Sequence, residues 1–265
     1  MPSRTATSCP AVIIRDTAEA AGASAGRAAA DVLTEVLERQ DRARVIFASA
    51  PSQEQMLATL GADPRIDWTR VQSFHMDDYL GLDPAHPAAF GTWLADRLPR
   101  AARAGLDRIR ADADPDQEAA RYGAALAAAP IDLVCLGIGV NGHIAFNEPG
   151  DTDFDTPEQV RLIELAHTSR QQQVDEGLFP DLESVPATAL TLTVPALLAG
   201  SVLVCTVLGA AKADAVAATL AGPVDPGVPA TAMLTHPRVR IHLDQAAAAQ
   251  LPAGHRTGRP AAGDG

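Results

Sequence analysis

Residues 133–150 read LVCLGIGVNGHIAFNEPG, and the interpretation of the whole chain starts from this stretch. Its first four residues, 133–136, are all apolar, which is typical of a short strand buried on both faces of a parallel sheet. Glycines follow at positions 137, 139 and 142, where the absence of a Cβ lets the backbone turn tightly and approach a neighbouring group. The stretch therefore predicts an α/β protein with a glycine turn at the end of a central strand.

Three polar side chains gather around this glycine turn. Asn141 and His143 flank Gly142, and Glu148 lies five residues further on. In open α/β sheets, ligands bind at the carboxyl ends of the strands, so we expect these residues to form a site there. Gly139 and Gly142 are expected to let the backbone approach the ligand.

The glycine spacing also satisfies the dinucleotide-binding fingerprint, with Gly137, Gly139 and Gly142 in register and Glu164 about 20 residues further on. That fingerprint requires its last glycine to open a helix. Here only six residues separate Gly142 from Pro149, so a helix would stop before completing two turns. We therefore interpret the match as accidental.

Composition restricts the class of protein. The 265 residues are 47% hydrophobic and 20% charged, which is typical of a globular protein with a substantial core. The formal net charge of -12 argues against nucleic acid or an anionic membrane as the main partner. An anionic substrate would need a local cationic pocket.

The cellular compartment is predicted from the cysteines and the termini. Three cysteines, two of them inside apolar runs, make disulfides unexpected and indicate a reducing cytoplasm. We see no apolar run of about 18 residues and no signal peptide at the start of the chain. Residues 1–10 are predicted to be a flexible leader and residues 252–265 a disordered tail.

Short strand patterns alternate with longer helical patterns along residues 11–251, which predicts one α/β domain with a mostly parallel sheet. The acidic segment 150–158 is expected to be a loop that acts as a lid. Strands are predicted at residues 12–14, 45–48, 71–74, 133–136, 160–165, 188–194, 202–208 and 239–243. Helices are predicted at residues 16–39, 53–60, 87–98, 115–128, 167–177, 213–221 and 230–234.

Two adjacent acids, Asp77 and Asp78, follow the strand predicted at residues 71–74, and His75 lies just before them. Taken alone, the pair has two interpretations. One is a helix cap on a solvated loop, and the other is a catalytic carboxylate at the carboxyl end of a strand.

Two further segments are candidates for holding an anion. Ser49, Ser52 and Gln53 lie in the turn after the strand at residues 45–48, where hydroxyls and the N–H groups of a helix start are available. Lys212 lies in the first turn of the helix after the strand at residues 202–208. A lysine there opposes the helix dipole unless an anion is also bound.

Three blocks of sequence carry a resemblance to a known family. FHMDDYLGL (74–82), LGIGVNGHIAFNEP (136–149) and LGAAK (208–212) resemble the glucosamine-6-phosphate deaminase (isomerase) family, which shares its fold with the 6-phosphogluconolactonases. The similarity covers roughly residues 10–245. It implies a single-domain, Rossmann-like three-layer sandwich that binds no nucleotide.

The resemblance also implies a reaction and roles for individual residues. Glucosamine 6-phosphate would be isomerised and deaminated to fructose 6-phosphate and ammonia, without metal or cofactor. Asp77 resembles the general base, His143 the group that helps open the sugar ring, and Glu148 the acid that orients this imidazole. Lys212 resembles the phosphate anchor. Asn141 occupies a position where many relatives carry a carboxylate.

The chain departs from the family pattern near the phosphate. The turn that contains Ser49, Ser52 and Gln53 replaces a glycine-rich turn of some members, and Arg170 is only a doubtful counterpart of an arginine that some members use. Two alternatives stay open: a sugar-lactone hydrolase of the 6-phosphogluconolactonase type, and a non-catalytic sugar-phosphate-binding protein. In each case a small sugar phosphate is the expected partner, and a homo-oligomer is possible.

Overall fold

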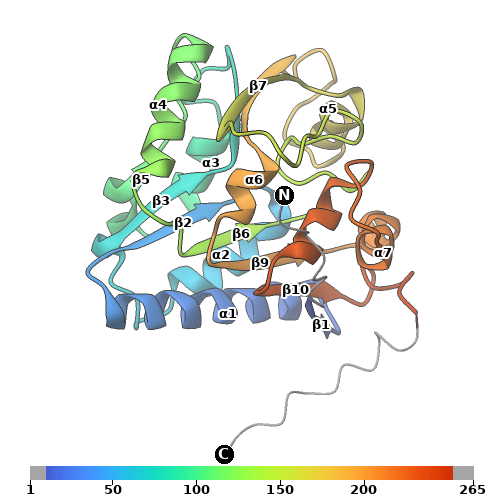
Figure 1. Ribbon diagram of the computed structural model, residues 1–265, viewed down its shortest axis with the longest axis horizontal. Helices are drawn as coiled ribbons and strands as arrows, with labels where there is room; N and C mark the ends of the chain where they lie inside the picture. Colours follow the sequence, from blue (N-terminus) through green and yellow to red (C-terminus); the bar gives the residue numbers. More distant parts are fainter. Residues whose placement is uncertain (1–9, 253–265) are drawn as a thin grey trace, which may run out of the picture.

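Seven parallel strands form the central sheet of the computed structural model, which describes residues 10–252 (Figure 1). Their order across the sheet is β1-β10-β9-β6-β2-β3-β5, and every neighbouring pair is parallel. The strands are β1 (Ala11–Arg15), β2 (Ala43–Phe47), β3 (Val71–His75), β5 (Leu106–Asp107), β6 (Leu133–Leu136), β9 (Val202–Val207) and β10 (Val239–Asp244).

Helices cover both faces of this sheet because successive side chains of its buried strands point to opposite sides. Val45 and Phe47 of β2 pack with one set of helices, whereas Ile46 between them packs with the other set. The first set is α1 (Ala18–Arg39), α2 (Glu54–Gly61) and α3 (Phe90–Arg97). The second set is α4 (Pro115–Ala127), α6 (Val194–Leu198) and α7 (Ala213–Ala221). The expected three-layer α/β fold is confirmed.

A second, antiparallel sheet of three strands lies on the side of α4 and α6. Its order is β4-β8-β7, with β4 (Asp77–Tyr79), β8 (Thr188–Leu192) and β7 (Val160–Glu164). A separate apolar cluster that includes Tyr79, Phe90 and Phe146 packs against it. The strands predicted near residues 160 and 188 therefore exist, but they belong to this second sheet.

Several element boundaries differ from the predictions. The helix predicted at residues 87–98 begins at Phe90, and the segment predicted as 230–234 is a 3-10 helix, Pro229–Thr235. The strand predicted to reach residue 194 ends at Leu192, because Thr193 caps α6 by accepting the Ala196 N–H at 3.3 Å. The predicted leader and tail lie almost entirely outside the described residues.

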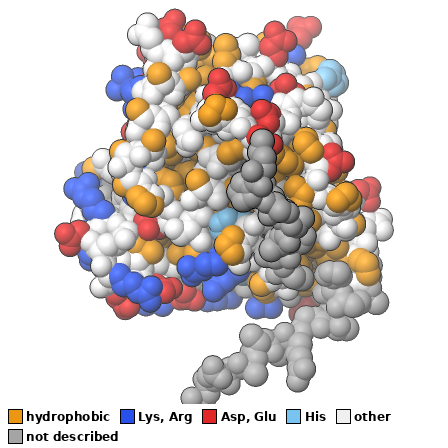
Figure 2. Space-filling view, in the orientation of Figure 1, with side chains coloured by type: hydrophobic (Ala, Val, Ile, Leu, Met, Phe, Trp, Pro, Cys, Tyr) orange, Lys and Arg blue, Asp and Glu red, His pale blue; other side chains and the backbone are white. Residues whose placement is uncertain are grey.

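The distribution of charge on the surface and the state of the cysteines can be compared with the predictions. Acidic, basic and hydrophobic side chains are interspersed over the face shown in Figure 2, so the net charge of -12 is not gathered into one patch there. Cys135 and Cys205 are buried free thiols. Within residues 10–252, no helix is both long and apolar enough to cross a membrane.

Candidate active site

A cleft that is partly open to solvent lies at the carboxyl ends of the central strands. The chain continues from β2 to β3 on one side and from β6 to β9 on the other, so the crossovers diverge between β2 and β6. A doubly wound sheet binds ligands at such a switch point. The polar and glycine residues that line the cleft include Ser49, Ser52, Asp77, Gly139, His143, Gln172, Gln173, Glu176, Thr206 and Lys212.

Asp77 reaches this cleft because the chain passes from the central sheet directly into the second one. It is the first residue of β4, where it pairs with Thr191 of β8, and the preceding Met76 carbonyl accepts the Leu192 N–H at 2.8 Å. The residue is 7% exposed. Burial, together with the charge of neighbouring Asp78, raises the pKa of Asp77 well above the ordinary aspartate value.

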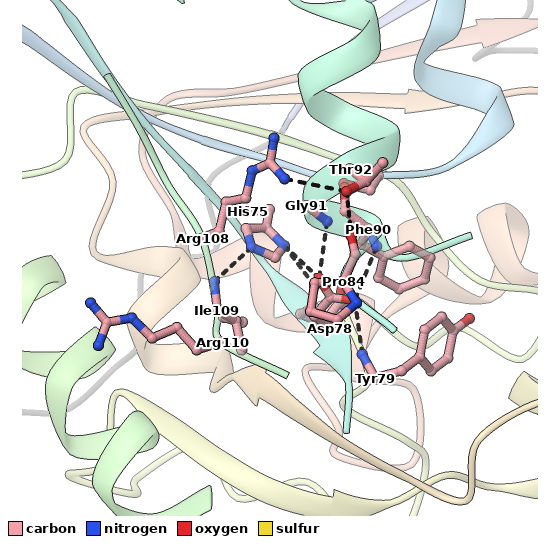
Figure 3. Close-up of polar contacts among 12 residues, drawn as sticks. His75, Asp78, Tyr79, Pro84, Phe90, Gly91, Thr92, Arg108, Ile109 and Arg110 are labelled. Atoms are coloured by element: carbon pink, nitrogen blue, oxygen red, sulfur yellow. Dashed lines mark hydrogen bonds and ion pairs between the residues drawn. The ribbon is translucent and has the colours of Figure 1, made fainter. Parts of the chain in front are cut away.

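His75 fixes the backbone of Asp77 through a hydrogen bond. Its Nε2 lies 2.9 Å from the Ile109 N–H and therefore accepts (Figure 3). The ring proton is therefore on Nδ1, which donates to the Asp77 carbonyl at 2.8 Å. Tyr122 fixes the backbone of His75, since its hydroxyl accepts the His75 N–H and donates to the His75 carbonyl, each at 2.9 Å. Burial lowers the pKa of His75, so the imidazole is neutral.

Asp78 has a different role from the acid beside it. Its Oδ1 accepts the Phe90 N–H at 3.0 Å and its Oδ2 accepts the Gly91 N–H at 3.0 Å, at the start of α3 (Figure 3). Oδ1 also accepts the N–H of Tyr79 at 2.9 Å. Asp78 therefore caps a helix as expected, but both acids are buried in β4, so the prediction of a solvated loop is wrong. Asp77 lines the cleft.

The imidazole of His143 lies flat against Gly139. A Cβ built on Gly139 would stand 2.2 Å from both Cε1 and Nε2 of this ring, so no other residue fits there. Asn141 fixes the tautomer: its Oδ1 accepts the His143 backbone N–H at 3.2 Å and lies 2.8 Å from Nδ1. Because that oxygen is an acceptor, Nδ1 carries the proton and Nε2 is left for a ligand.

Glu148 lies on the Nδ1 side of the imidazole, where three side chains contact its carboxylate. Its Oε1 is 3.5 Å from His143 Nδ1 and accepts from the Ser169 hydroxyl, while its Oε2 accepts from Asn141 Nδ2 at 2.8 Å. Burial raises the pKa of Glu148, but hydrogen bonds from His143, Ser169 and Asn141 outweigh it and lower the pKa to about 2. Asn141, which is closer to the ring than Glu148, therefore connects these two residues.

Two residues predicted to contact ligand lie outside the cleft lining. Gln53 is fully buried, and its Nε2 donates to the Thr206 carbonyl at 3.3 Å, so it braces β9 against the turn after β2. Gly142 has a φ of 85°, and a Cβ there would meet the side chain of Val228 at 2.7 Å. Gln53 ties two turns together, and Gly142 permits a left-handed turn under a tight packing contact.

The two predicted serines do line the cleft, although they differ in the freedom of their hydroxyls. Ser49 donates to the Phe90 carbonyl at 3.1 Å and is buried, so its side chain is already engaged. Ser52 accepts a hydrogen bond from Gln53 Nε2 at 3.2 Å, which leaves its own proton available to a ligand oxygen.

Lys212, the predicted phosphate anchor, also lines the cleft. It ends the 3-10 helix Ala210–Lys212, just before α7, and its Nζ lies 3.6 Å from Oε1 of Glu176. Arg170 points elsewhere, since its guanidinium donates to the carbonyls of Leu182 and Val185 at 2.6 and 2.9 Å. The doubtful arginine is therefore not a cleft residue.

Sequence reasoning missed the contribution of α5 (His167–Asp175) and the residue that follows it. Ser169 binds Glu148, and Gln172, Gln173 and Glu176 line the cleft. The side chains of this helix are almost all polar, so no apolar face revealed its orientation. The run of three glutamines at positions 171–173 is the signal in the sequence that points to a polar site on this helix.

Residues 16–242 match the family described as glucosamine-6-phosphate isomerases/6-phosphogluconolactonase. The chain belongs to this family. A curated relative, glucosamine-6-phosphate deaminase of Exiguobacterium sibiricum, is 35% identical over 200 residues, or 74% of this chain and 77% of the relative. The deaminase of Lactobacillus delbrueckii subsp. bulgaricus is 34% identical over 190 residues, covering 71% and 79%.

Solved structures of family members have the same fold. A monomeric glucosamine-6-phosphate deaminase superposes with a TM-score of 0.83 at 27% identity, covering 91% of this chain and 99% of that one. The 6-phosphogluconolactonase of Trypanosoma brucei superposes with a TM-score of 0.74 at 16% identity, covering 92% and 99%. The second similarity concerns the fold alone.

Proposed function

We propose that this protein is an amino-sugar-phosphate deaminase that converts glucosamine 6-phosphate and water into fructose 6-phosphate and ammonia. The observation that carries the proposal is that Asp77 and His143 line one cleft together with Lys212. A base, an oriented imidazole and a cation are the groups that this reaction needs. The curated relatives named above support the same substrate.

The first step assigned to the site is opening of the sugar ring. His143 exchanges a proton between the anomeric hydroxyl and the ring oxygen through Nε2, since Nδ1 already carries the proton that faces Asn141. Glu148 remains a carboxylate at neutral pH because its pKa is about 2. Its charge stabilises the imidazolium that forms transiently beside it.

The second step is transfer of a proton from C2 to C1 by Asp77. The carboxylate removes the C2 proton, and the electron pair forms the C1–C2 double bond while the C1=O π pair moves onto O1. O1 takes a proton from the substrate ammonium group, which gives a neutral enolamine. Return of the proton to C1 leaves a protonated imine at C2. Water adds to this carbon, and the C2–N bond breaks to release ammonia and the ketose phosphate. The raised pKa of Asp77 makes its carboxylate a stronger base, and the substrate ammonium group favours the ionised form.

The proposal is tested by incubating the purified protein with glucosamine 6-phosphate and measuring ammonia and fructose 6-phosphate together. Equal amounts of both products are expected. 6-Phosphogluconolactone serves as the control substrate, and no hydrolysis above the spontaneous rate is expected. Lactone hydrolysis without ammonia release would replace this proposal with the lactonase alternative. Homo-oligomer formation and a cytoplasmic location stay predictions.

A further inference from the structure

The cation of the cleft is already paired in the free protein. Lys212 Nζ lies 3.6 Å from Glu176 Oε1, and both side chains are mostly buried, with 13% and 23% of their surfaces exposed. Among the described residues that line the cleft, Lys212 is the only lysine or arginine, whereas Asp77 and Glu176 are both acids. A ligand phosphate that reaches Lys212 therefore meets a carboxylate at the same place.

Glu176 is held in this position rather than free to swing away. Gln172 donates from Nε2 to Glu176 Oε1 at 2.8 Å, and its own Oε1 accepts the Val140 N–H at 3.3 Å. One glutamine thus connects the acid to the turn after β6. The backbone is also fixed, because the Glu176 N–H donates to the Gln172 carbonyl at 2.9 Å at the end of α5.

A phosphate monoester carries a charge of about -1.5 to -2 at neutral pH. Beside the mostly buried carboxylate of Glu176, these like charges repel each other. Binding then requires that the Lys212–Glu176 pair break and that Glu176 rotate away or take a proton. A sugar with a free hydroxyl at the same carbon meets no such repulsion, and it can donate a hydrogen bond to the carboxylate.

We infer that Glu176 is a specificity-determining residue that weakens the preference of this cleft for phosphorylated over unphosphorylated amino sugars. The inference deepens the proposed function and rests on it for the identity of the sugar. The part that concerns anion binding does not require turnover. It can therefore be tested with inorganic phosphate alone.

The experiment compares the wild-type protein with Glu176→Gln, which keeps an oxygen that can accept from Gln172 but removes the charge. Calorimetric titration is expected to show inorganic phosphate binding about tenfold more tightly to the variant, equivalent to about 1.4 kcal/mol. With glucosamine 6-phosphate, KM is expected to fall about tenfold at nearly unchanged kcat. With glucosamine, KM is expected to stay constant or rise.

Asp175→Asn provides the matched control, because it removes one acid from the neighbouring position, which is exposed and faces Gln171. No change in phosphate binding is expected for it. Unchanged or weaker phosphate binding in Glu176→Gln, or an equal gain in Asp175→Asn, would overturn the inference. Tighter phosphate binding without any ammonia release would instead refute the proposed function alone.

Discussion

Two groups of residues in the same cleft are built very differently. Asp77 and His143 form the proposed proton-transfer group; the backbone of Asp77 is fixed by the second sheet and by His75, and the His143 ring by Asn141. Lys212 and Glu176, the anion group, are held by one ion pair and one glutamine. This chain fixes the residues assigned to proton transfer through several parts of the fold, whereas it pairs the cation with a single acid that one substitution can change. Substitutions in the two groups should therefore have different kinetic consequences.

The largest effect is expected for Asp77→Asn. An amide of the same shape cannot remove a proton from carbon, so kcat for ammonia release should fall about 10²–10⁴-fold with KM little changed. Steady-state kinetics with glucosamine 6-phosphate measure this effect. Lys212→Met should show the opposite pattern, a higher KM with a smaller loss of kcat. If both variants changed KM alone, the division into two groups would be wrong.

Gly139→Ala is expected to have the next largest effect. The new Cβ would stand 2.2 Å from the His143 ring, so the imidazole must leave its position against the turn. A displacement of about 1 Å costs about 10²-fold in rate, which should appear in kcat. Gly123→Ala is the control, since its Cβ would meet only ordinary contacts from 3.4 Å upward. Full activity in Gly139→Ala would show that the imidazole position is unimportant.

His75→Phe tests whether the hydrogen bond from His75 to the Asp77 carbonyl matters for the reaction. Loss of the hydrogen bond to the Asp77 carbonyl leaves that carbonyl and the Ile109 N–H unpaired, which should lower the free energy of unfolding by about 1–3 kcal/mol. We expect kcat to fall about tenfold at constant KM. His75→Asn retains a donor near Nδ1 and should recover much of kcat. Equal kcat losses in both variants would assign His75 a purely structural role.

The smallest effect concerns the pH dependence of kcat/KM. Burial and Asp78 raise the pKa of Asp77, so this base takes up a proton at a higher pH than an ordinary aspartate does. As the pH is lowered, activity should therefore begin to decline while the pH is still above the ordinary range of aspartate pKa values. Asp78→Asn removes the neighbouring negative charge, so the acidic limb of the pH profile should move to lower pH. A limb that stays in place or moves upward would contradict the electrostatic coupling of the pair.

The parts of the fold set by local pattern were predictable. The apolar run of β6 followed by glycines correctly placed the cleft at the carboxyl edge of the sheet, and the same block contained His143, Asn141 and Glu148. The second sheet was not predictable in this way. β4 has only three residues, and its partner β8 lies more than 100 positions later in the chain, so pairing depends on tertiary packing rather than on periodicity.

Side-chain roles were harder to predict than element positions. Gln53 and Gly142 have residue types suited to holding an anion, but whether they face a ligand or brace the fold depends on neighbours that are distant in sequence. Ser169 and Glu176 could not be predicted because the orientation of their helix was unknown. A helix with few apolar residues gives no signal about which side it turns towards the cleft.

Exchange of hydrogen at C1 of fructose 6-phosphate tests the central claim most directly. In D2O with ammonium present, the reverse reaction should let the wild-type protein replace one C1 proton by deuterium, which NMR detects without any coupled enzyme. We predict that Asp77→Asn, with inorganic phosphate binding as the check of folding, abolishes this exchange. Exchange by Asp77→Asn at the wild-type rate would show that another group moves the proton.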